Sequence, residues 1–229
     1  MARSGNMPTT SSNRKAPRAA RALAAAWLLA GCSGISNGDV TSIYKIAKNV
    51  VSGGSQKVTL EEAAAQPYAS MGLRLDGGPQ TMIILASDTS GDQLWTSSAR
   101  IAITTHDGRI VRTAGLGHDL GGLQSRIGPP GPDGARVIVA QADFPDLKLY
   151  AVPIACRDKP AGEETIAILG KDIHTLLIDE SCVSKASELR WSFHNKFWID
   201  SQSGLVWRSI QHVNPKLDAL ETEILRPPG

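Results

Sequence analysis

This 229-residue sequence lacks several of the short motifs from which metalloenzymes and cofactor-binding proteins build their sites. Its five histidines show none of the HxH, HxxxH or HExxH spacings that bring two imidazoles to one zinc ion. It also contains no CxxC pair and no P-loop. Aromatic residues make up only 5% of the chain, so few positions can stack on a base or a sugar ring. The sequence therefore predicts no metal and no cofactor.

Few residues in the sequence are candidates for the acid and base of a catalytic site. His118 and Asp119 are adjacent, beside a glycine-rich stretch, where they could form half of a catalytic pair. A glycosidase needs two facing carboxylates, and Asp107, Asp119 and Asp200 are the candidates. Turn and loop roles explain all three, because aspartate is common where a chain turns. A catalytic function is therefore the least favoured hypothesis.

Acidic residues are absent from the first 31 positions, whereas basic residues are frequent there. A nine-residue apolar stretch from Ala22 to Ala30 follows the basic residues and leads to Gly31 and Cys32. A basic start, a short apolar segment and small residues before a cleavage point are typical of a secretory signal. The basic side chains of this signal are Arg3, Arg14, Lys15, Arg18 and Arg21.

Residues 28–32, Leu-Leu-Ala-Gly-Cys, resemble a bacterial lipobox. The resemblance implies that the Cys32 sulfur receives a diacylglyceryl group, that the chain is cut before Cys32, and that the new amine is acylated, for example with palmitate. A plain signal peptide or a short transmembrane anchor are the alternatives, although nine apolar residues fall well below the ~20 that span a bilayer. Ser33, rather than aspartate, follows the cysteine, which in enterobacterial lipoproteins implies export to the outer membrane.

Removal of residues 1–31 leaves 198 residues, enough for one sizeable hydrophobic core. Five of the 24 basic residues leave with the signal, so 19 basic and 22 acidic side chains remain, a formal net charge of −3. The sequence pI of 8.5 thus describes the precursor and gives no support for nucleic-acid binding. Residues 32–38 are predicted to be a tether, and residues 39–229 a single β-rich domain.

Two cysteines, Cys156 and Cys182, remain in the mature chain. An oxidising periplasm favours a disulfide between two such residues. A metal site and a catalytic thiol are the functional alternatives, but no cluster of cysteine and histidine supports either. The two cysteines could also be buried free thiols. A structural disulfide is the favoured hypothesis.

Two helices are expected before the β-rich part of the chain. Apolar residues recur at helical spacing over 40–50, which predicts an amphipathic helix. A second, short helix is predicted from Thr59, because Glu62 three positions later completes a capping box. Pro67 ends this second helix.

Alternating apolar residues between turn residues predict many short strands from Tyr68 onward. Asp107-Gly108 between two such strands is a strong hairpin signal. Residues 114–135 are rich in glycine and proline and are expected to form a long loop. A sheet of this size must curl, split or close to protect its edges. The predicted fold is mainly β: a large antiparallel meander sheet, curled like a barrel or a sandwich around the N-terminal helix. The expected strands are 71–75, 81–86, 100–104, 109–113, 135–144, 147–156, 165–169, 174–179, 190–200, 205–213 and 219–225.

Several local patterns occur in a fixed order along the mature chain. They are Pro67-Tyr-Ala-Ser70, Leu94-Trp95-Thr-Ser, the hairpin over 107–116, His118-Asp119-Leu120, Phe197-Trp198-Ile-Asp200, the segment over 204–211, and Leu225-Arg226-Pro227. Together with the lipobox they resemble the YjbF/GfcB family of outer-membrane lipoproteins, which belong to operons for group 4 capsule and related exopolysaccharides. The stretch over 128–190 carries little of this resemblance.

The resemblance implies a non-enzymatic accessory lipoprotein of capsule or exopolysaccharide assembly and export, anchored at the periplasmic face of the outer membrane. Its expected partners are an outer-membrane β-barrel, periplasmic polysaccharide-export proteins and the polysaccharide itself. One alternative is a carrier or binding module that holds a lipid or glycan in the hollow of the sheet. A polysaccharide-modifying enzyme is the least favoured alternative.

The aromatic residues gather near the end of the chain. Trp191, Phe193 and Trp207 can share one face, which favours a role in the core. Trp198 follows Phe197 directly, so on a regular strand the two rings point to opposite faces, and one of them faces solvent or a second buried layer. A partner or a glycan could contact this region; the candidate contact residues are Trp198, Arg208 and Gln211, with an ordinary polar outer face as the alternative.

Overall fold

The computed structural model describes residues 56–229, so the signal, Cys32, the tether and the helix expected over 40–50 lie outside the described residues. The described chain begins with the short helix α2, Leu60–Ala64. The Thr59 hydroxyl accepts a hydrogen bond from the Glu62 backbone N–H at 3.2 Å, and the Glu62 carboxylate accepts one from the Thr59 N–H at 2.8 Å. This reciprocal pair is the capping box predicted for the start of the helix.

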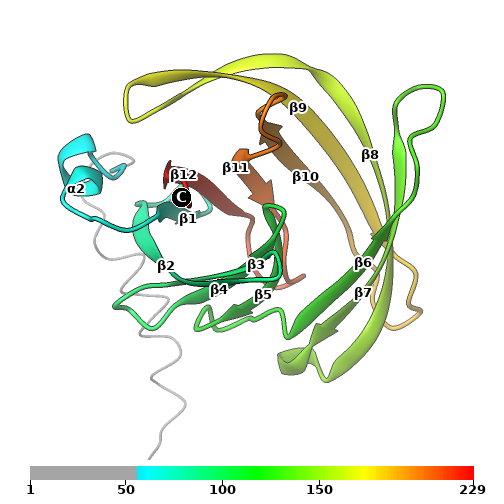
Figure 1. Ribbon diagram of the computed structural model, residues 1–229. Coiled ribbons are helices and arrows are strands. Elements are labelled where there is room, and N and C mark those ends of the chain that lie inside the picture. Colours follow the sequence, from blue (N-terminus) through cyan, green and yellow to red (C-terminus); the bar gives the residue numbers. More distant parts are fainter. Residues whose placement is uncertain (1–55) are drawn as a thin grey trace, which may run out of the picture. The chain divides into compact units, whose positions relative to one another are not determined.

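Twelve antiparallel strands follow and form one continuous sheet (Figure 1). Their order in the sheet is β5-β4-β3-β2-β1-β12-β11-β10-β9-β8-β7-β6. Consecutive strands therefore pair with each other except β5 and β6, and the first strand, β1, also pairs with the last, β12. The strands are β1 Ser70–Leu75, β2 Thr81–Thr89, β3 Asp92–Thr96, β4 Ala102–His106, β5 Arg109–Ala114, β6 Gly122–Ile127, β7 Arg136–Phe144, β8 Leu149–Ile168, β9 Lys171–Ser184, β10 Ser192–Ile199, β11 Val206–Gln211 and β12 Leu220–Arg226. The prediction of a large, curled antiparallel meander is confirmed.

The sheet curls until its two edge strands, β5 and β6, lie next to each other and nearly close a barrel (Figure 1). At one end of this seam the Thr113 N–H donates to the Leu120 carbonyl oxygen at 2.9 Å. Elsewhere the two edges are not paired, as their positions at opposite ends of the strand order show. Bringing the two edges together in this way is one means by which a large sheet limits pairing with other chains.

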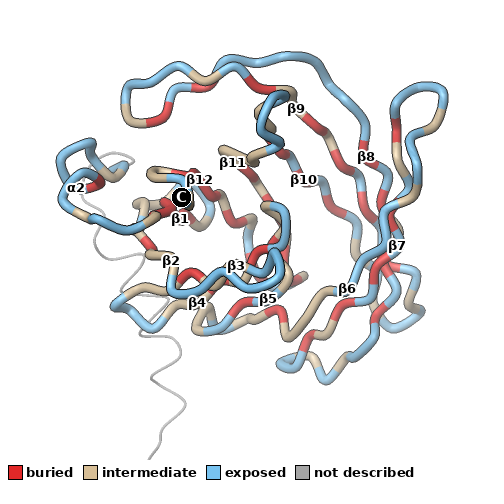
Figure 2. The backbone as a smooth tube through the Cα atoms, viewed as in Figure 1, coloured by how far each residue is buried: buried red, intermediate tan, exposed pale blue. Residues whose placement is uncertain are grey.

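Alternating side chains along the strands fill the inside of the curled sheet. Strand β7 shows the pattern most clearly, with Ile138, Ala140, Ala142 and Phe144 buried and the residues between them mostly exposed (Figure 2). Period-two alternation is expected when one face of a sheet packs and the other meets water. The largest fully buried apolar side chains of this core are Trp95, Phe144, Ile83, Ile103, Ile110, Ile138 and Leu220.

A second, smaller apolar cluster lies on the other face of the sheet, around Trp198 of β10. Ile166 and Ile168, near the tip of the long β8–β9 hairpin, pack with it. Phe197, the neighbour of Trp198, is buried as well, so the two rings point into different layers. The expectation that one of them lies in a second buried layer is thus fulfilled by Trp198.

Three details of the expected strand pattern are wrong. The supposed loop over 114–135 contains edge strand β6, whose outer residues from Gln124 to Ile127 are exposed and lack an apolar alternation. The short strand β3 was missing from the expectation because its five residues carry too little pattern. The segments 147–156 and 165–169 belong to the single strand β8. Pro160 lies between these two segments, at a register shift of the β8–β9 pairing, where proline is tolerated.

Candidate functional site

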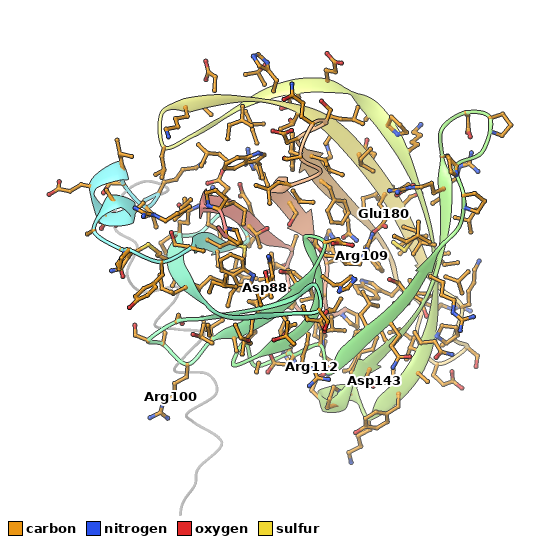
Figure 3. All side chains as sticks on the ribbon, viewed as in Figure 1. Asp88, Arg100, Arg109, Arg112, Asp143 and Glu180 are labelled. Atoms are coloured by element: carbon orange, nitrogen blue, oxygen red, sulfur yellow. A yellow bond between two sulfur atoms is a disulfide. The ribbon has the colours of Figure 1, made fainter. Side chains whose placement is uncertain are left out.

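A charged pair crosses the inside of the sheet between β5 and β9. Arg109 donates from Nη1 and Nη2 to the two carboxylate oxygens of Glu180, at 3.0 and 2.6 Å (Figure 3). Glu180 has no exposed surface, and its Oε1 also accepts a hydrogen bond from the Asn195 amide at 2.7 Å. The Arg109 guanidinium lies 5.0 Å from the centre of the Phe197 ring. A two-bond arginine–carboxylate pair of this kind is among the stronger polar contacts in proteins.

A second charged pair lies beside the first. Asp158 of β8 stands opposite Glu180 in the register of the sheet and accepts hydrogen bonds from Arg136 Nε and Nη2 at 3.1 and 2.6 Å. The hydrogen bonds that Arg136 donates to Asp158 raise the pKa of its guanidinium, and the nearby Glu180 charge adds to this effect. The negative charges of Glu180 and Asp158 are therefore neutralised by two guanidiniums. A buried charge requires such a partner.

Gln211 of β11 extends this polar layer to the edge strand. Its side-chain oxygen accepts the Ile110 N–H at 3.0 Å, and its side-chain nitrogen donates to the Gly108 carbonyl at 2.9 Å. These bonds join segments about 100 positions apart in the chain. With the Arg109–Glu180 pair, they hold edge strand β5 against the opposite wall of the sheet. We refer to Arg109, Arg136, Asp158, Glu180, Asn195 and Gln211 as the interior polar layer.

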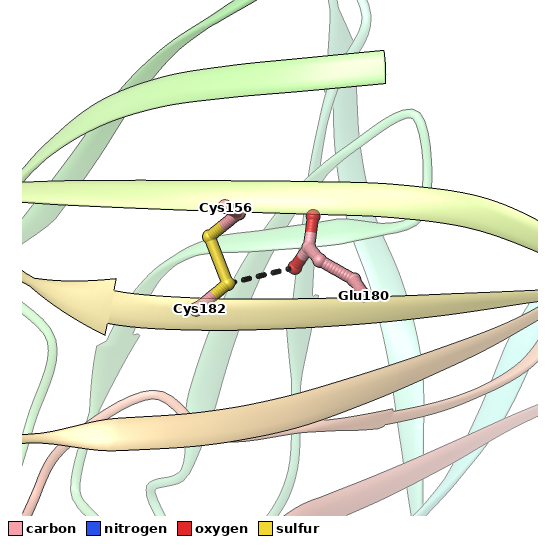
Figure 4. A group of neighbouring side chains, drawn as sticks. All are labelled: Cys156, Glu180 and Cys182. Carbon is pink, nitrogen blue, oxygen red and sulfur yellow. Dashed lines mark hydrogen bonds between the residues drawn. A yellow bond between two sulfur atoms is a disulfide. The ribbon is translucent and has the colours of Figure 1, made fainter. Parts of the chain in front are cut away.

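The two remaining cysteines lie directly next to this layer. Cys156 and Cys182 stand opposite each other on β8 and β9 and form a disulfide, with a Cα–Cα distance of 4.1 Å (Figure 4). Glu180 Oε1 lies 3.4 Å from the Cys182 sulfur. Three ligand-type side chains thus meet here. The sulfurs are bonded to each other and the Glu180 carboxylate is occupied by Arg109 and Asn195, so this group is arranged for structure rather than for metal binding.

The candidate catalytic residues serve the loops in which they lie. The Asp119 carboxylate accepts hydrogen bonds from the Thr113 hydroxyl at 2.9 Å and from the Gly115 and Leu116 N–H groups at 3.1 and 3.2 Å. His118 contacts Asp146, at 2.7 Å, instead of Asp119. A carboxylate that accepts three hydrogen bonds within its own turn has a structural role there.

Asp107 and Asp200 also lie at turns. Asp200 accepts the N–H groups of Gln202 and Ser203 at 2.8 and 2.9 Å, and these bonds lower the pKa of its carboxyl, that from Ser203 most. Asp107, with a side chain 92% exposed, occupies the β4–β5 turn in a left-handed conformation. The structure thus places all three candidate carboxylates in turns or loops, which agrees with the turn and loop roles expected for them.

The three predicted contact residues have internal partners. Trp198 is 6% exposed; its ring lies 5.1 Å from the Arg208 guanidinium and its Nε1 donates to Glu164 at 2.9 Å. Arg208 pairs with Glu221, and Gln211 is 3% exposed in the interior polar layer. Contact of these residues with a partner or glycan stays a prediction. For Trp198 it would require Ile166 and Ile168 of the β8–β9 hairpin to move away from the ring.

The space inside the sheet is small. The cavity between the core and the interior polar layer measures about 30 Å³, roughly the room for two water molecules. The described residues thus fill their own interior and leave no hollow for a lipid or a sugar chain there.

A larger, polar hollow lies at the seam where the two sheet edges meet. It measures about 480 Å³, and we call it the seam groove. No sequence pattern indicated it, because its residues come from six strands, β3 to β8, and from the connection before β6. They are Asp92, Thr104, Val111, Arg112, Gly121, Gly122, Leu123, Gln124, Gln141, Asp143 and Ala151.

Residues 44–225 match the family model described as "Group 4 capsule polysaccharide lipoprotein gfcB, YjbF". The chain belongs to the YjbF/GfcB family. Two relatives from Escherichia coli K12 are similar to it. The uncharacterized lipoprotein GfcB is 26% identical over 185 residues, covering 76% of this chain and 84% of GfcB. The uncharacterized lipoprotein YjbF is 24% identical over 178 residues, covering 74% of this chain and 81% of YjbF.

A solved structure resembles the YjbF/GfcB chain described above. The hypothetical lipoprotein YmcC from Escherichia coli K12 superimposes with a TM-score of 0.59 at 21% identity, over 86% of this chain and 100% of YmcC. At that identity the likeness shows a shared fold. Among the described residues of this family member, no helix has both the length and the apolar character needed to cross a membrane.

Proposed function

We propose that this chain is a non-enzymatic accessory lipoprotein that assists capsule or exopolysaccharide assembly and export from the periplasmic face of the outer membrane. The observation that carries the proposal is the match of residues 44–225 to a family described by its group 4 capsule polysaccharide lipoproteins. The lipobox ending at Cys32 supports the anchored location, and Ser33 supports the outer membrane.

A role without catalysis is supported by the way the candidate acid–base residues are used. Asp119 caps a turn, His118 pairs with Asp146, and the charges of the interior polar layer neutralise one another. A catalytic group needs a pKa and a position suited to proton transfer with a substrate. Residues that hold a loop in place or form internal ion pairs are better suited to maintaining the shape of the protein than to catalysis.

A protein partner is supported by apolar side chains on the outer face of β7 to β9. Val139, Ala155 and Val183 stand side by side on three neighbouring strands. Val139 is 60% exposed and Val183 38%, and Val137 on the same strand as Val139 is 54% exposed. Apolar residues grouped on an outer sheet face are typical of protein contact surfaces. We propose an outer-membrane β-barrel or a periplasmic export protein as the partner.

The alternative function is that of a carrier or binding module. The described interior, with about 30 Å³ of free space, does not favour a lipid held inside the sheet. The seam groove supports this alternative, because it is an open, polar hollow in which a ligand could bind. A binding role at that place is compatible with an export accessory, because such a protein could hold polymer while a partner moves it.

Replacing Cys32 by alanine is expected to release the protein from membranes, because the lipid anchor cannot form without the sulfur. Replacing Ser33 by aspartate is the matched control: it keeps the cysteine, and by the enterobacterial sorting rule it should move the protein to the inner membrane. Palmitate labelling and separation of the two membranes on a density gradient measure both effects. A Cys32→Ala protein that stays with membranes would refute the anchor.

Cells that lack the protein should still synthesise polymer but should carry less of it on their surface, with the remainder retained inside the envelope. Extraction of surface and periplasmic polysaccharide from the same culture measures this. Surface polymer in normal amount but with altered chain length or substitution would instead favour an enzyme.

A further inference from the structure

We infer that the seam groove binds a short segment of a hydroxyl-rich polysaccharide that carries little net charge. This inference rests on the proposed function and assigns the polymer a place on the protein. The groove, at about 480 Å³, falls within the roughly 300–1,000 Å³ of small-molecule sites. It is many times larger than the interior cavity of about 30 Å³.

The polar side chains of the groove come in facing pairs set by the register of the sheet. Thr104 stands opposite Arg112 across β4 and β5, and Gln124 stands opposite Gln141 across β6 and β7. Arg112, Gln124 and Gln141 are exposed. Within residues 56–229 none of these four makes a side-chain hydrogen bond, so their donors and acceptors are available to a ligand.

These groups match the hydrogen-bonding needs of neighbouring sugar hydroxyls. An amide offers a donor and an acceptor side by side, a guanidinium offers several donors in a plane, and a carboxylate accepts two bonds. A hydroxyl both donates and accepts hydrogen bonds. Neighbouring sugar hydroxyls can therefore bond to the amide, guanidinium and carboxylate groups of the groove. Val111, Leu123 and Ala151 supply apolar surface against which the C–H face of a sugar ring can pack.

The charges of the groove do not favour a strong polyanion. Arg112 is accompanied by Asp143, and both side chains are found near the seam (Figure 3). Asp143 Oδ1 accepts the Ala151 N–H at 2.7 Å, which fixes the carboxylate in the groove wall. Asp92 adds a second carboxylate, which contacts His106 at 2.8 Å. One guanidinium against two carboxylates would repel a densely acidic polymer, so we assign a polymer of low charge.

Gly122 offers a way to fill the groove without disturbing the protein. A Cβ atom placed there would have only Asp143 Oδ2 within 4 Å, at 3.8 Å, which is an ordinary contact distance. At the preceding Gly121 a Cβ atom would come within 2.9 Å of the Pro145 ring. A leucine at position 122 should therefore project into the groove, where it replaces ligand volume and leaves the fold intact.

The test uses the full mature lipoprotein in detergent micelles and, as the probe, oligosaccharides released by mild acid from the surface polymer of the producing strain. Titration calorimetry should show binding to the wild type. Gly122→Leu and the double variant Gln124→Ala/Gln141→Ala should each raise the Kd at least tenfold. Gln202→Ala, which changes an exposed glutamine in the β10–β11 turn, should leave the Kd unchanged. Absence of binding by the wild type, or equal binding by the groove variants, would overturn the inference.

Thermal unfolding of each variant shows whether a loss of binding follows from a loss of fold. If Gly122→Leu unfolds at the wild-type temperature and no longer binds the oligosaccharides, the groove is supported as the binding site. If it still binds them, the groove is rejected.

A parallel cell assay separates this inference from the proposed function. If deletion of the gene lowers surface polymer and Gly122→Leu restores it fully, the export function stands and the groove assignment falls. If deletion has no effect on surface polymer, the proposed function itself falls. Binding only of an extended peptide at the sheet edges would also reject the assignment.

Discussion

Replacing Glu180 by glutamine is expected to lower the free energy of unfolding by about 3–5 kcal/mol, the usual cost of removing one partner from a buried ion pair. Glu180 is fully buried, and its two oxygens hold Arg109 and Asn195. Without the carboxylate charge, the Arg109 guanidinium remains inside the sheet with no counterion. The loss should be measured by urea denaturation, where the midpoint falls and the slope stays constant.

Two further variants make this prediction specific. Glu163→Gln removes an exposed carboxylate from the same β8–β9 hairpin and should change stability by no more than about 0.5 kcal/mol. Arg109→Met combined with Glu180→Leu removes both charges and should recover much of the loss, because an apolar pair can replace a buried ion pair. Equal stabilities for Glu180→Gln and Glu163→Gln would contradict the structural role of the interior polar layer.

Loss of the Cys156–Cys182 disulfide is the second change with a large expected effect. The bond closes a loop of 26 positions, and the chain-entropy model assigns about 3–4 kcal/mol to such a closure. Both residues are buried beside the interior polar layer, so the oxidised form should also keep the β8–β9 pairing in register. Denaturation of the wild type with and without reductant measures the difference.

The matched control for the disulfide is the double variant Cys156→Ala/Cys182→Ala. It should unfold at a lower denaturant concentration than the oxidised wild type, and reductant should have no effect on it. Mass analysis under non-reducing conditions should find one peptide pair joined through these two residues. Free thiols in protein exported to the periplasm would show that the bond does not form there.

Local signals in the sequence predicted much of the fold. The Asp107-Gly108 turn between two alternating segments gave the β4–β5 hairpin, and the Thr59 capping box gave the start of α2. Both features are formed by residues that are close together in the sequence, so they can be predicted from a short segment of it. Edge strand β6 escaped prediction because its exposed residues need not be apolar, and its glycines resemble those of a loop.

The sites could not be predicted in the same way, because they depend on pairs far apart in the chain. Arg109 meets Glu180 across 71 positions, and Gln211 meets Gly108 across 103. One local signal was available: Glu180 lies between Ile178 and Cys182 on the inward-facing side of β9, where an unpaired acid would be costly. That placement indicates a buried counterion but does not identify it. The seam groove had no such signal, since it exists only once the sheet has curled.

The most direct test of the account is the amount of polysaccharide on the surface of cells that lack this protein. Complementation should compare the wild type, Cys32→Ala, and a His118→Ala/Asp119→Ala double variant produced at matched levels. We predict that surface polymer is lost on deletion, returns with the wild type and with any double variant that folds, and does not return with Cys32→Ala. Normal surface polymer in the deleted strain, or full rescue by Cys32→Ala, would contradict an anchored export accessory.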